Sequence, residues 1–323
     1  MKRKAFVTGS TGMDGAILCE KLLKQDYEVY GLVRRSATDN TDNINHIIND
    51  IEVIDGELTD SFLIGETIRL VKPDRVFNTA AMSHVGYSFK NPQLTTEVNY
   101  LGVLNLLEAI RLHSPESRFI QASTSEMFGG VYTEPCNEET VLYPLSPYAV
   151  AKAAAHYLVR NYREAYNLFA MCAICFNHEH TTRGLQFVTR KATRSAAKIK
   201  LGMIEKVGFG NIETYRDWGW APDYMDGWIK ALDYKEPTEF VFATGKTHCI
   251  KDMLKHVFEY AGLGDYKNYV YRDPKFYRPS DVNVLLGDAS KAKELLGWEP
   301  TTSFETMIEN MYDNDYKDLK VLE

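Results

Sequence analysis

The sequence predicts an α/β protein, with a doubly wound parallel sheet followed by a smaller mixed α/β lobe. Three observations lead to this prediction. Apolar runs typical of strands alternate with helical patterns over residues 4–176. A glycine-rich turn joins the first of these strands to the first helix. After Phe176 the alternation breaks, and shorter elements follow in which arginines stand beside aromatic residues.

The first strand, expected over residues 4–8, runs into Gly9-Ser-Thr-Gly12-Met-Asp-Gly15, and a helical pattern follows over 17–24. Gly-x-x-Gly-x-x-Gly between a strand and a helix is typical of a Rossmann-type dinucleotide-binding turn. The glycines allow the backbone to approach a pyrophosphate, which rests on the N-terminus of the helix. We therefore predict a dinucleotide cofactor at this turn.

The second strand, expected over residues 27–33, ends in Arg34-Arg35-Ser36. A site for NAD tends to carry an acidic residue here, which binds the ribose 2′-hydroxyl. Arginine and a serine hydroxyl instead suit a 2′-phosphate. This pattern predicts NADP as the cofactor, and the alternative is a pair of solvated arginines.

The rest of the first part continues the alternation. Strands are predicted at 51–54, 74–78, 118–122 and 169–176, with helices at 60–71, 92–113 and from 146 onward. The loops at the carboxyl ends of these strands lie where this architecture binds ligands. We expect Leu58, in the acidic turn after the third strand, to pack on an adenine ring. A late strand at 239–243 is expected to return to the same sheet.

The fifth strand delivers a hydroxyl, Thr124, and a carboxylate, Glu126, to this edge of the sheet. Further along, Ser146-Pro147 marks a helix start, with the serine as N-cap and the proline at the first helical position. Tyr148 and Lys152 then lie one turn apart on one face. Lys152 and the positive helix end both favour the phenolate of Tyr148, so the pair is a candidate acid/base. The alternative is a surface Tyr and Lys on an ordinary helix.

The second part is predicted as a mixture of short elements. We expect helices at 187–201, 223–232, 250–261, 291–296 and 304–312, a hairpin at 207–215 that turns at Gly210-Asn211, and a strand at 269–272. The helix at 187–201 carries Arg190, Lys191, Arg194, Lys198 and Lys200. These cations form a solvated face, or one or two of them bind a diphosphate.

Two patterns invite a metal or redox interpretation, and neither is favoured. Asn177-His178-Glu179-His180 follows a strand end in a loop, with no second cluster elsewhere. Cys172 and Cys175 lie inside the apolar strand 169–176, where a spacing of three puts side chains on opposite faces. We predict no metal site, and no disulfide framework among the five cysteines.

The composition bounds the class of protein. With 323 residues, 45% apolar and 25% charged, the chain can bury a large core. A net charge of −7 argues against nucleic acid as the main partner. No apolar run is long enough to cross a membrane, and the first ten residues do not form a signal peptide. We therefore expect a cytoplasmic protein without nucleic-acid or membrane partners.

Together these motifs resemble those of the extended short-chain dehydrogenase/reductases. The segments VTGSTGMDG, GLVRRS, QASTSEMFG, SPYAVAK, FVTRK and KAKELLGW, spread over nearly the whole chain, are similar to those of the GDP-mannose 4,6-dehydratase family. The resemblance implies a Rossmann NADP-binding domain at 1–177, to which 212–245 returns, and a nucleotide-sugar-binding lobe at 178–211 and 246–323. It also implies a homodimer or a homotetramer.

The resemblance implies a redox-neutral reaction on GDP-mannose. NADP+ takes hydride from C4, water is eliminated across C5 and C6, and the hydride returns to C6, which gives GDP-4-keto-6-deoxy-mannose. Tyr148 is expected to remove the O4 proton, while Lys152 lowers its pKa and holds the nicotinamide ribose. Thr124 is expected to bond O4, and Glu126 to take the C5 proton and help water leave.

The resemblance also assigns binding residues by position. The cofactor set is Gly9, Thr11, Gly12, Met13, Asp14, Gly15, Arg34, Arg35, Ser36, Glu57, Leu58, Ala80, Ala81, Ser83, Tyr148, Lys152, His178 and Arg183. The substrate set is Ser83, Thr124, Ser125, Glu126, Asn177, Val188, Lys191, Arg216, Arg278 and Asp281, with Arg216 and Arg278 on the diphosphate.

Several positions depart from the family pattern. Glu57 replaces Asp, Thr79-Ala80 replaces Leu-Gly, Met82 replaces Gln, Leu94 replaces Tyr, His180-Thr181-Thr182 replaces Ser-Pro-Arg, Trp220 replaces His and Asp281 replaces Glu. None of them is one of the four expected catalytic residues. We expect these departures to affect cofactor affinity and subunit contacts.

Two other functions remain open from the sequence. A nucleotide-sugar 4-epimerase or reductase of the same superfamily needs the Tyr–Lys pair but no proton-abstracting carboxylate at position 126, so Glu126 favours the dehydratase. A non-catalytic protein that binds NADP and a nucleotide sugar would tolerate loss of the catalytic groups, yet all four are present.

Overall fold

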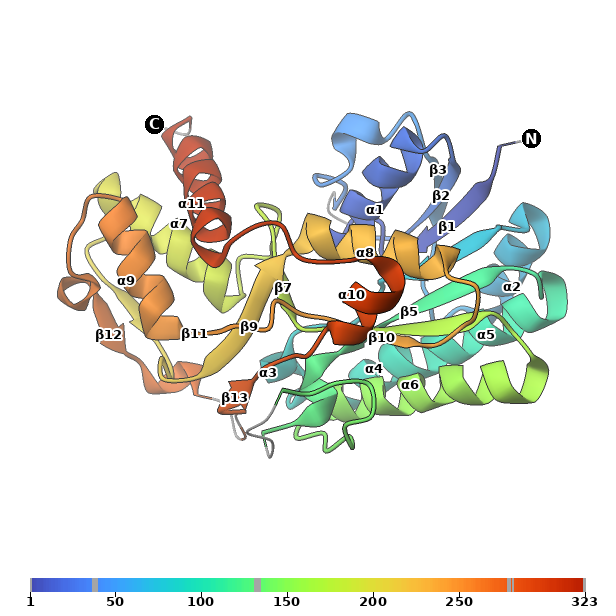
Figure 1. The fold of residues 1–323 in the computed structure, drawn as a ribbon. Coiled ribbons are helices and arrows are strands. Elements are labelled where there is room, and N and C mark those ends of the chain that lie inside the picture. Colours follow the sequence, from blue (N-terminus) through green and yellow to red (C-terminus); the bar gives the residue numbers. More distant parts are fainter. Residues whose placement is uncertain (1, 37–39, 131–134, 278–279, 281, 322–323) are drawn as a thin grey trace.

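The protein consists of a large α/β lobe and a smaller lobe, which lie side by side in the computed structural model (Figure 1). The structure describes residues 2–36, 40–130, 135–277, 280 and 282–321. Among these, no helix combines the length and the apolar character needed to cross a membrane. The predicted class, a doubly wound parallel sheet with a smaller mixed lobe, is confirmed.

A parallel sheet forms the centre of the large lobe. Its strands are β1 (Lys4–Thr8), β2 (Glu28–Val33), β3 (Glu52–Asp55), β4 (Arg75–Asn78), β5 (Arg118–Thr124), β6 (Ala170–Cys175) and β10 (Glu239–Phe242). The described residues place them in the order β10-β6-β5-β4-β1-β2-β3. β10 pairs with β6 in parallel, which confirms the late strand expected at 239–243.

Helices cover both faces of this sheet (Figure 1). One face carries α1 (Met13–Lys24) and α8 (Ala221–Asp233), and the other carries α2 (Ser61–Val71), α4 (Pro92–Thr96), α5 (Gly102–His113) and α6 (Pro147–Tyr166). Because both faces are covered, every residue of β6 is buried. Cys172 packs with the core under α5 and α6, and Cys175 packs with the core under α1 and α8.

The opposite orientation of these two thiols confirms the prediction for the Cys-x-x-Cys pair. Cys172 and Cys175 are both buried and free. Nowhere in the described ranges do three or more His, Cys, Asp or Glu side chains cluster as a metal site would require.

The smaller lobe is built around β9 (Tyr215–Trp220), which pairs with three short strands. These are β7 (Asn177–Glu179), β11 (Thr247–Cys249) and β13 (Val284–Leu285). A separate parallel pair joins β8 (Val207–Phe209) to β12 (Val270–Arg272). The helices α7 (Val188–Lys200), α9 (Ile250–Tyr260) and α11 (Phe304–Lys320) share one apolar core (Figure 1). The short helix α10 (Ser290–Leu296) lies between β13 and α11 in sequence.

The hairpin expected at 207–215 is wrong. β8 pairs with β12, while β9 pairs with β7, β11 and β13, so the two segments never pair with each other. Gly210 does not adopt the positive φ that a tight hairpin turn needs. A Cβ at this glycine would lie 2.6 Å from the Phe276 carbonyl oxygen, so the residue serves a close approach of two chain segments.

Two further local predictions are corrected. Residues 177–179 form β7 instead of a loop, because β9 supplies a parallel partner. The helix expected over 92–113 is interrupted by a π-helical turn at Glu97–Leu101. This turn lets the Asn99 side chain accept from Met82 N at 2.7 Å and donate to Met82 O at 3.2 Å. The π turn therefore ties α4 and α5 to the loop after β4.

Asp217 of β9 holds three chain segments together. Its carboxylate is buried and accepts from Thr244 N at 2.8 Å, Thr244 Oγ1 at 2.6 Å, Gly245 N at 2.9 Å and Gly287 N at 3.3 Å. These donors belong to the turn after β10 and to the segment after β13. The bonds therefore connect the large sheet to the smaller lobe.

Replacing Asp217 with alanine should lower the free energy of unfolding by roughly 3 kcal/mol or more, because the N–H groups of Thr244, Gly245 and Gly287 and the Thr244 hydroxyl lose their buried acceptor. Asp226→Ala is the matched control: its carboxylate is half exposed and pairs with Lys21, so we expect a loss below about 1 kcal/mol. Urea denaturation measures both. Similar losses in the two variants would show that the Asp217 bonds do not hold the segments together.

Candidate active site

The carboxyl end of β5 provides the first two candidate groups. Thr124 is the last residue of the strand, and its hydroxyl accepts from Glu126 N at 3.3 Å, which caps the short helical turn Ser125–Phe128. Thr124 and Ser125 are buried, while Glu126 is half-buried. Thr124, the last residue of the strand, thus caps the turn that carries the Glu126 carboxylate.

The start of α6 provides the other two. Ser146 Oγ accepts from Ala149 N at 3.1 Å and Pro147 occupies the first helical position, as predicted. Tyr148 and Lys152 both face inward and are buried. Lys152 Nζ lies 5.9 Å from the centre of the Tyr148 ring and donates to Ala122 O at 2.9 Å. The predicted one-turn pair is confirmed, and the alternative of a surface pair is wrong.

Burial dominates the electrostatics of this pair. It raises the pKa of Tyr148 above the ordinary value, although a hydrogen bond with Thr124 and the charge of Arg183 act in the opposite direction. Burial also lowers the pKa of Lys152 to about 8. We expected Lys152 to lower the pKa of Tyr148. In the protein alone the pKa of Tyr148 is nevertheless raised, because withdrawing the phenolate from water outweighs the opposing effects of Thr124 and Arg183. The contribution of Lys152 itself stays a prediction.

The glycine turn lies at the same edge of the sheet. Gly12 N donates to Gly9 O at 2.9 Å, and Gly9 has φ of 66°. A Cβ at Gly15 would lie 2.2 Å from Gly9 O, and one at Gly9 would lie 2.9 Å from the backbone of Ala80. The turn therefore packs against the loop after β4, which carries the predicted residues Ala80, Ala81 and Ser83.

An ion pair joins the start of α1 to β7. His178 Nε2 lies 3.1 Å from both carboxylate oxygens of Asp14, and His178 Nδ1 donates to Phe176 O at 2.8 Å. Although burial opposes ionisation of both groups, their attraction lowers the pKa of Asp14 and raises the pKa of His178. Both predicted cofactor residues thus lie together beside the glycine turn.

Arg183 follows β7 and reaches the same region. Its Nε lies 3.0 Å from the buried Glu179 carboxylate, and its guanidinium lies 3.7 Å from the Phe187 ring centre. Its charge contributes to the lowered pKa of Asp14 and partly opposes the rise in the pKa of Tyr148 that burial causes. Burial raises the pKa of Glu179. Sequence reasoning assigned no role to Glu179, and its place in a short strand gave no local signal of one.

The residues predicted for the cofactor's adenosine side lie at the ends of β2 and β3. Arg34, Arg35 and Ser36 are exposed where β2 ends. Arg35 lines an open groove with Glu57 and neighbours of the turn after β3. Leu58 is buried, and its side chain lies against Gly102 of α5. Its contact with an adenine ring stays a prediction.

The residues predicted for the substrate lie in the smaller lobe. Lys191 of α7 donates to Gly208 O at 2.5 Å, and its Nζ lies 3.3 Å from the Phe276 ring centre and 4.6 Å from that of Phe209. Burial lowers the pKa of Lys191 to about 8. The two phenylalanines had no role in the sequence analysis, because the β8–β12 pairing that brings them together is not visible locally.

Three other residues predicted to bind the substrate lie on different elements of the smaller lobe. Val188 begins α7 near Lys191, and Asn177 begins β7. Arg216 is buried, and its Nη1 donates to Tyr215 O at 2.9 Å and Val282 O at 2.7 Å. Arg278 and Asp281 lie outside the described residues.

Solved structures place this fold among enzymes that act on nucleotide sugars. A UDP-glucose 4-epimerase from Thermotoga maritima, solved with UDP-glucose, is 26% identical, with a TM-score of 0.87 over 99% of this chain and 100% of that one. A UDP-glucose 4-epimerase from Thermus thermophilus, solved with NAD, is 26% identical, with a TM-score of 0.85 over 97% and 98% of the two chains. This chain thus shares its fold with these two enzymes, one of which was solved with a nucleotide sugar and the other with NAD.

Sequence comparison narrows this class to one family. The model of the family described as GDP-mannose 4,6 dehydratase matches residues 6–311. GDP-mannose 4,6 dehydratase 1 of Arabidopsis thaliana is 44% identical over 326 residues, 97% of this chain and 90% of that protein. The GDP-mannose 4,6 dehydratase of Homo sapiens is 41% identical over 337 residues, 96% of this chain and 91% of that protein. The chain belongs to the GDP-mannose 4,6-dehydratase family, as the motifs predicted.

Replacing Lys152 with methionine should stabilise the protein at neutral pH while it abolishes turnover. Because the folded pKa is about 8 and the ordinary value is 10.5, protonation of Lys152 opposes folding below pH 8, and this opposition fades as the pH rises from 8 to 10.5. We expect a gain of about 1–2 kcal/mol in the free energy of unfolding at pH 7.

Urea denaturation of the wild type and of Lys152→Met over this pH range tests the sign. The stability difference should shrink between pH 8 and pH 10.5. A difference that stays constant, or a variant that is less stable than the wild type at pH 7, would contradict the effect of burial on Lys152.

Proposed function

We propose that the protein is an NADP-dependent GDP-mannose 4,6-dehydratase, which converts GDP-mannose into GDP-4-keto-6-deoxy-mannose with loss of one water. The hydride that leaves C4 returns to C6, so the reaction is redox-neutral. The position of Glu126 supports this most strongly: it lies in the turn that Thr124 caps at the end of β5, and the same strand holds Lys152 through Ala122 O. A carboxylate beside a Tyr–Lys pair supplies a second acid/base group, which elimination requires and which simple oxidation or epimerisation does not.

The glycine turn fits a dinucleotide. Among the described residues no side chain caps the N-terminus of α1 at Gly12, so its first N–H groups can bind a pyrophosphate. A Cβ at Gly9 or Gly15 would lie too close to neighbouring backbone atoms, so glycine is required at both positions. The turn therefore presents no side chain there. Asp14, His178 and Arg183 lie beside it. When bound, the nicotinamide supplies a reversible acceptor of hydride.

The roles proposed for the protein's own groups are those that the family resemblance implies, and the positions of these groups support them. The Thr124 hydroxyl favours ionisation of the Tyr148 phenol, and both groups are proposed to contact O4 of the hexose. Tyr148 takes the O4 proton during oxidation at C4. The resulting ketone acidifies C5, and Glu126 removes that proton and protonates the departing C6 hydroxyl. Lys152, held by Ala122 O, keeps the Tyr148 side of the site positive.

The choice of NADP rests on the end of β2. Arg34, Arg35 and Ser36 are exposed there, where a 2′-phosphate would be bound. Direct titration should give tighter binding of NADP+ than of NAD+. Charge-assisted bonds of about 1.5–3 kcal/mol make the expected ratio at least about ten-fold. Equal affinity, or tighter binding of NAD+, would refute NADP as the cofactor.

Replacing Glu126 with glutamine should stop the reaction after oxidation, because an amide cannot take the C5 proton. With GDP-mannose and NADP+, the variant should accumulate reduced cofactor, visible as near-ultraviolet absorbance, with turnover reduced by about 100-fold or more. Glu139→Gln, at an exposed position outside the site, is the matched control and should keep wild-type turnover. Undiminished turnover in Glu126→Gln would remove Glu126 from the mechanism.

Three other expectations stay predictions. They are the division into a cofactor domain and a substrate lobe at the stated boundaries, the homodimer or homotetramer, and the cytoplasmic location. Light scattering of the purified protein tests the oligomeric state, and a monomer at working concentration would refute the expected homodimer or homotetramer.

A further inference from the structure

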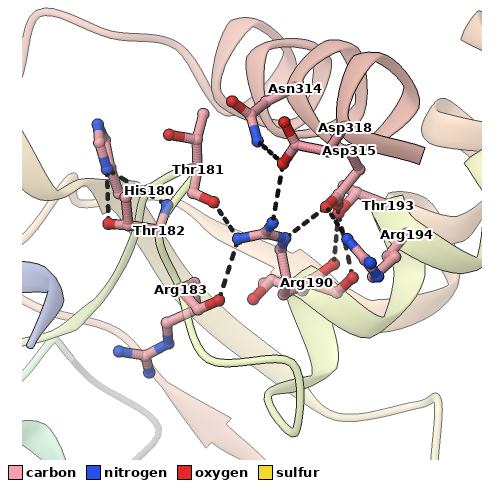
Figure 2. Close-up of polar contacts among 11 residues, drawn as sticks. His180, Thr181, Thr182, Arg183, Arg190, Thr193, Arg194, Asn314, Asp315 and Asp318 are labelled. Carbon is pink, nitrogen blue, oxygen red and sulfur yellow. Dashed lines mark hydrogen bonds and ion pairs between the residues drawn. The ribbon is translucent and has the colours of Figure 1, made fainter. Parts of the chain in front are cut away.

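A buried ion pair joins two helices of the smaller lobe. Arg190 Nε of α7 donates to Asp315 Oδ1 of α11 at 2.6 Å, and the two side chains are 8% and 0% exposed (Figure 2). Thr193 Oγ1 donates to the other carboxylate oxygen at 2.6 Å, and Arg194 Nη1 lies 3.5 Å from Oδ1. Asp315 is therefore satisfied by three side chains of α7, which fixes the orientation of the Arg190 guanidinium.

The other edge of this guanidinium faces the turn formed by residues 180–184, which follows β7. Arg190 Nη1 donates to the backbone carbonyl oxygens of Thr181 and of Arg183, the latter at 3.1 Å (Figure 2). Within the turn, Arg183 N donates to His180 O at 3.0 Å. Two carbonyls of one short segment are thus held by a single side chain that is itself anchored to α11.

This turn carries a cation into the candidate active site. The Arg183 side chain points away from the Arg190–Asp315 pair in Figure 2. Its Nε lies 3.0 Å from the carboxylate of Glu179 in β7, next to His178, which pairs with Asp14 at the glycine turn. On the other side of the turn, the His180 ring lies 4.7 Å from the Trp220 ring of β9. The backbone of residues 180–184 thus positions Arg183 together with the Glu179 carboxylate and the Phe187 ring, which contact its guanidinium.

We propose that Arg190 and Asp315 are positioning residues of the dehydratase site, which hold residues 180–184 so that Arg183 reaches the cofactor. This inference rests on the proposed function, since Arg183 is assigned there to the cofactor. The planar guanidinium is suited to the task because it presents several donors in a fixed fork, toward the carboxylate on one edge and the carbonyls on the other. A lysine has one nitrogen and cannot span both edges.

The C-terminal helix α11 thereby becomes part of the site without touching a ligand. Removing the charge of Asp315 would leave the buried Arg190 without its main partner, and the guanidinium would turn toward Asp318, whose carboxylate is 4.0 Å away. The carbonyls of Thr181 and Arg183 would then lose their donor. The turn would move, and the Arg183 charge would move with it.

A double-mutant cycle in NADP+ binding tests this. Arg190→Lys, Arg183→Ala and the double variant are titrated with NADP+ as full-length proteins. Misplacement of a binding group by about 1 Å justifies an expected loss of about ten-fold or more in affinity for Arg190→Lys. If Arg190 acts through Arg183, the double variant should bind no more weakly than Arg183→Ala alone. Asp315→Asn should reproduce the loss seen in Arg190→Lys.

Arg163→Lys is the matched control, since Arg163 also joins a backbone carbonyl, Ala170 O at 3.1 Å, to a carboxylate, Glu239 at 2.6 Å, at the far end of α6. It should lose thermal stability like Arg190→Lys but keep its NADP+ affinity. Thr193→Val removes one bond to Asp315 and is the milder second variant, with a smaller loss in the same direction.

Two results would overturn the inference: losses of affinity that multiply in the double variant, or an equal loss in Arg163→Lys. The readout also separates this inference from the proposed function. A wild-type protein that binds NADP+ with the predicted coupling but does not dehydrate GDP-mannose would refute the function and keep the positioning role. A wild-type protein that dehydrates GDP-mannose but shows no coupling between Arg190 and Arg183 would refute the positioning role and keep the proposed function.

Discussion

The buried, charged amino group of Lys152 at the carboxyl end of the parallel sheet is the constraint on which the site depends. Lys152 is withdrawn from water and donates to Ala122 O, so the start of α6 and the end of β5 must keep one relative position. Such a cation opposes folding unless its surroundings compensate for it. The N-cap of Ser146 and the inward face of α6 hold it there, and the same geometry places Tyr148 beside Thr124.

The rest of the site is assembled from segments that are distant in the chain. The glycine turn begins α1, the His178–Asp14 pair joins that helix to β7, and Arg183 follows β7. Arg190 and Asp315 then connect this region to α11, near the end of the chain. A reaction that moves a hydride and two protons needs all of these groups in fixed relative positions. The packing of the smaller lobe against the edge of the sheet meets this need, which a flexible linker between the lobes would not.

The local parts of this arrangement could be predicted from the sequence. Gly9–Gly15, Ser146-Pro147 and the Tyr148–Lys152 spacing each encode a turn or helix start within a few residues, and the structure confirms them. The orientation of Cys172 and Cys175 followed from strand periodicity alone.

The parts that failed depend on pairing across long sequence distances. The predicted hairpin at 207–215 was wrong because the partner of β8 is β12. The cations of α7 were interpreted as a solvated face or as diphosphate ligands, yet Arg190 and Arg194 face Asp315 on α11. Helical spacing shows which residues share a face, and it does not show which helix that face meets. The rise in the pKa of Tyr148 could not be predicted for the same reason, since the burial that causes it comes from tertiary packing.

The central claim is that one hydride leaves C4 of the sugar and returns to C6 within the same active site. The most direct measurement uses GDP-mannose that carries deuterium at C4, incubated with the protein and NADP+, and follows the label in the product by NMR and mass spectrometry. We predict that the deuterium appears in the C6 methyl group of GDP-4-keto-6-deoxy-mannose and that one water is lost. Deuterium that stays at C4, or that is lost from the sugar without reaching C6, would contradict the proposed reaction.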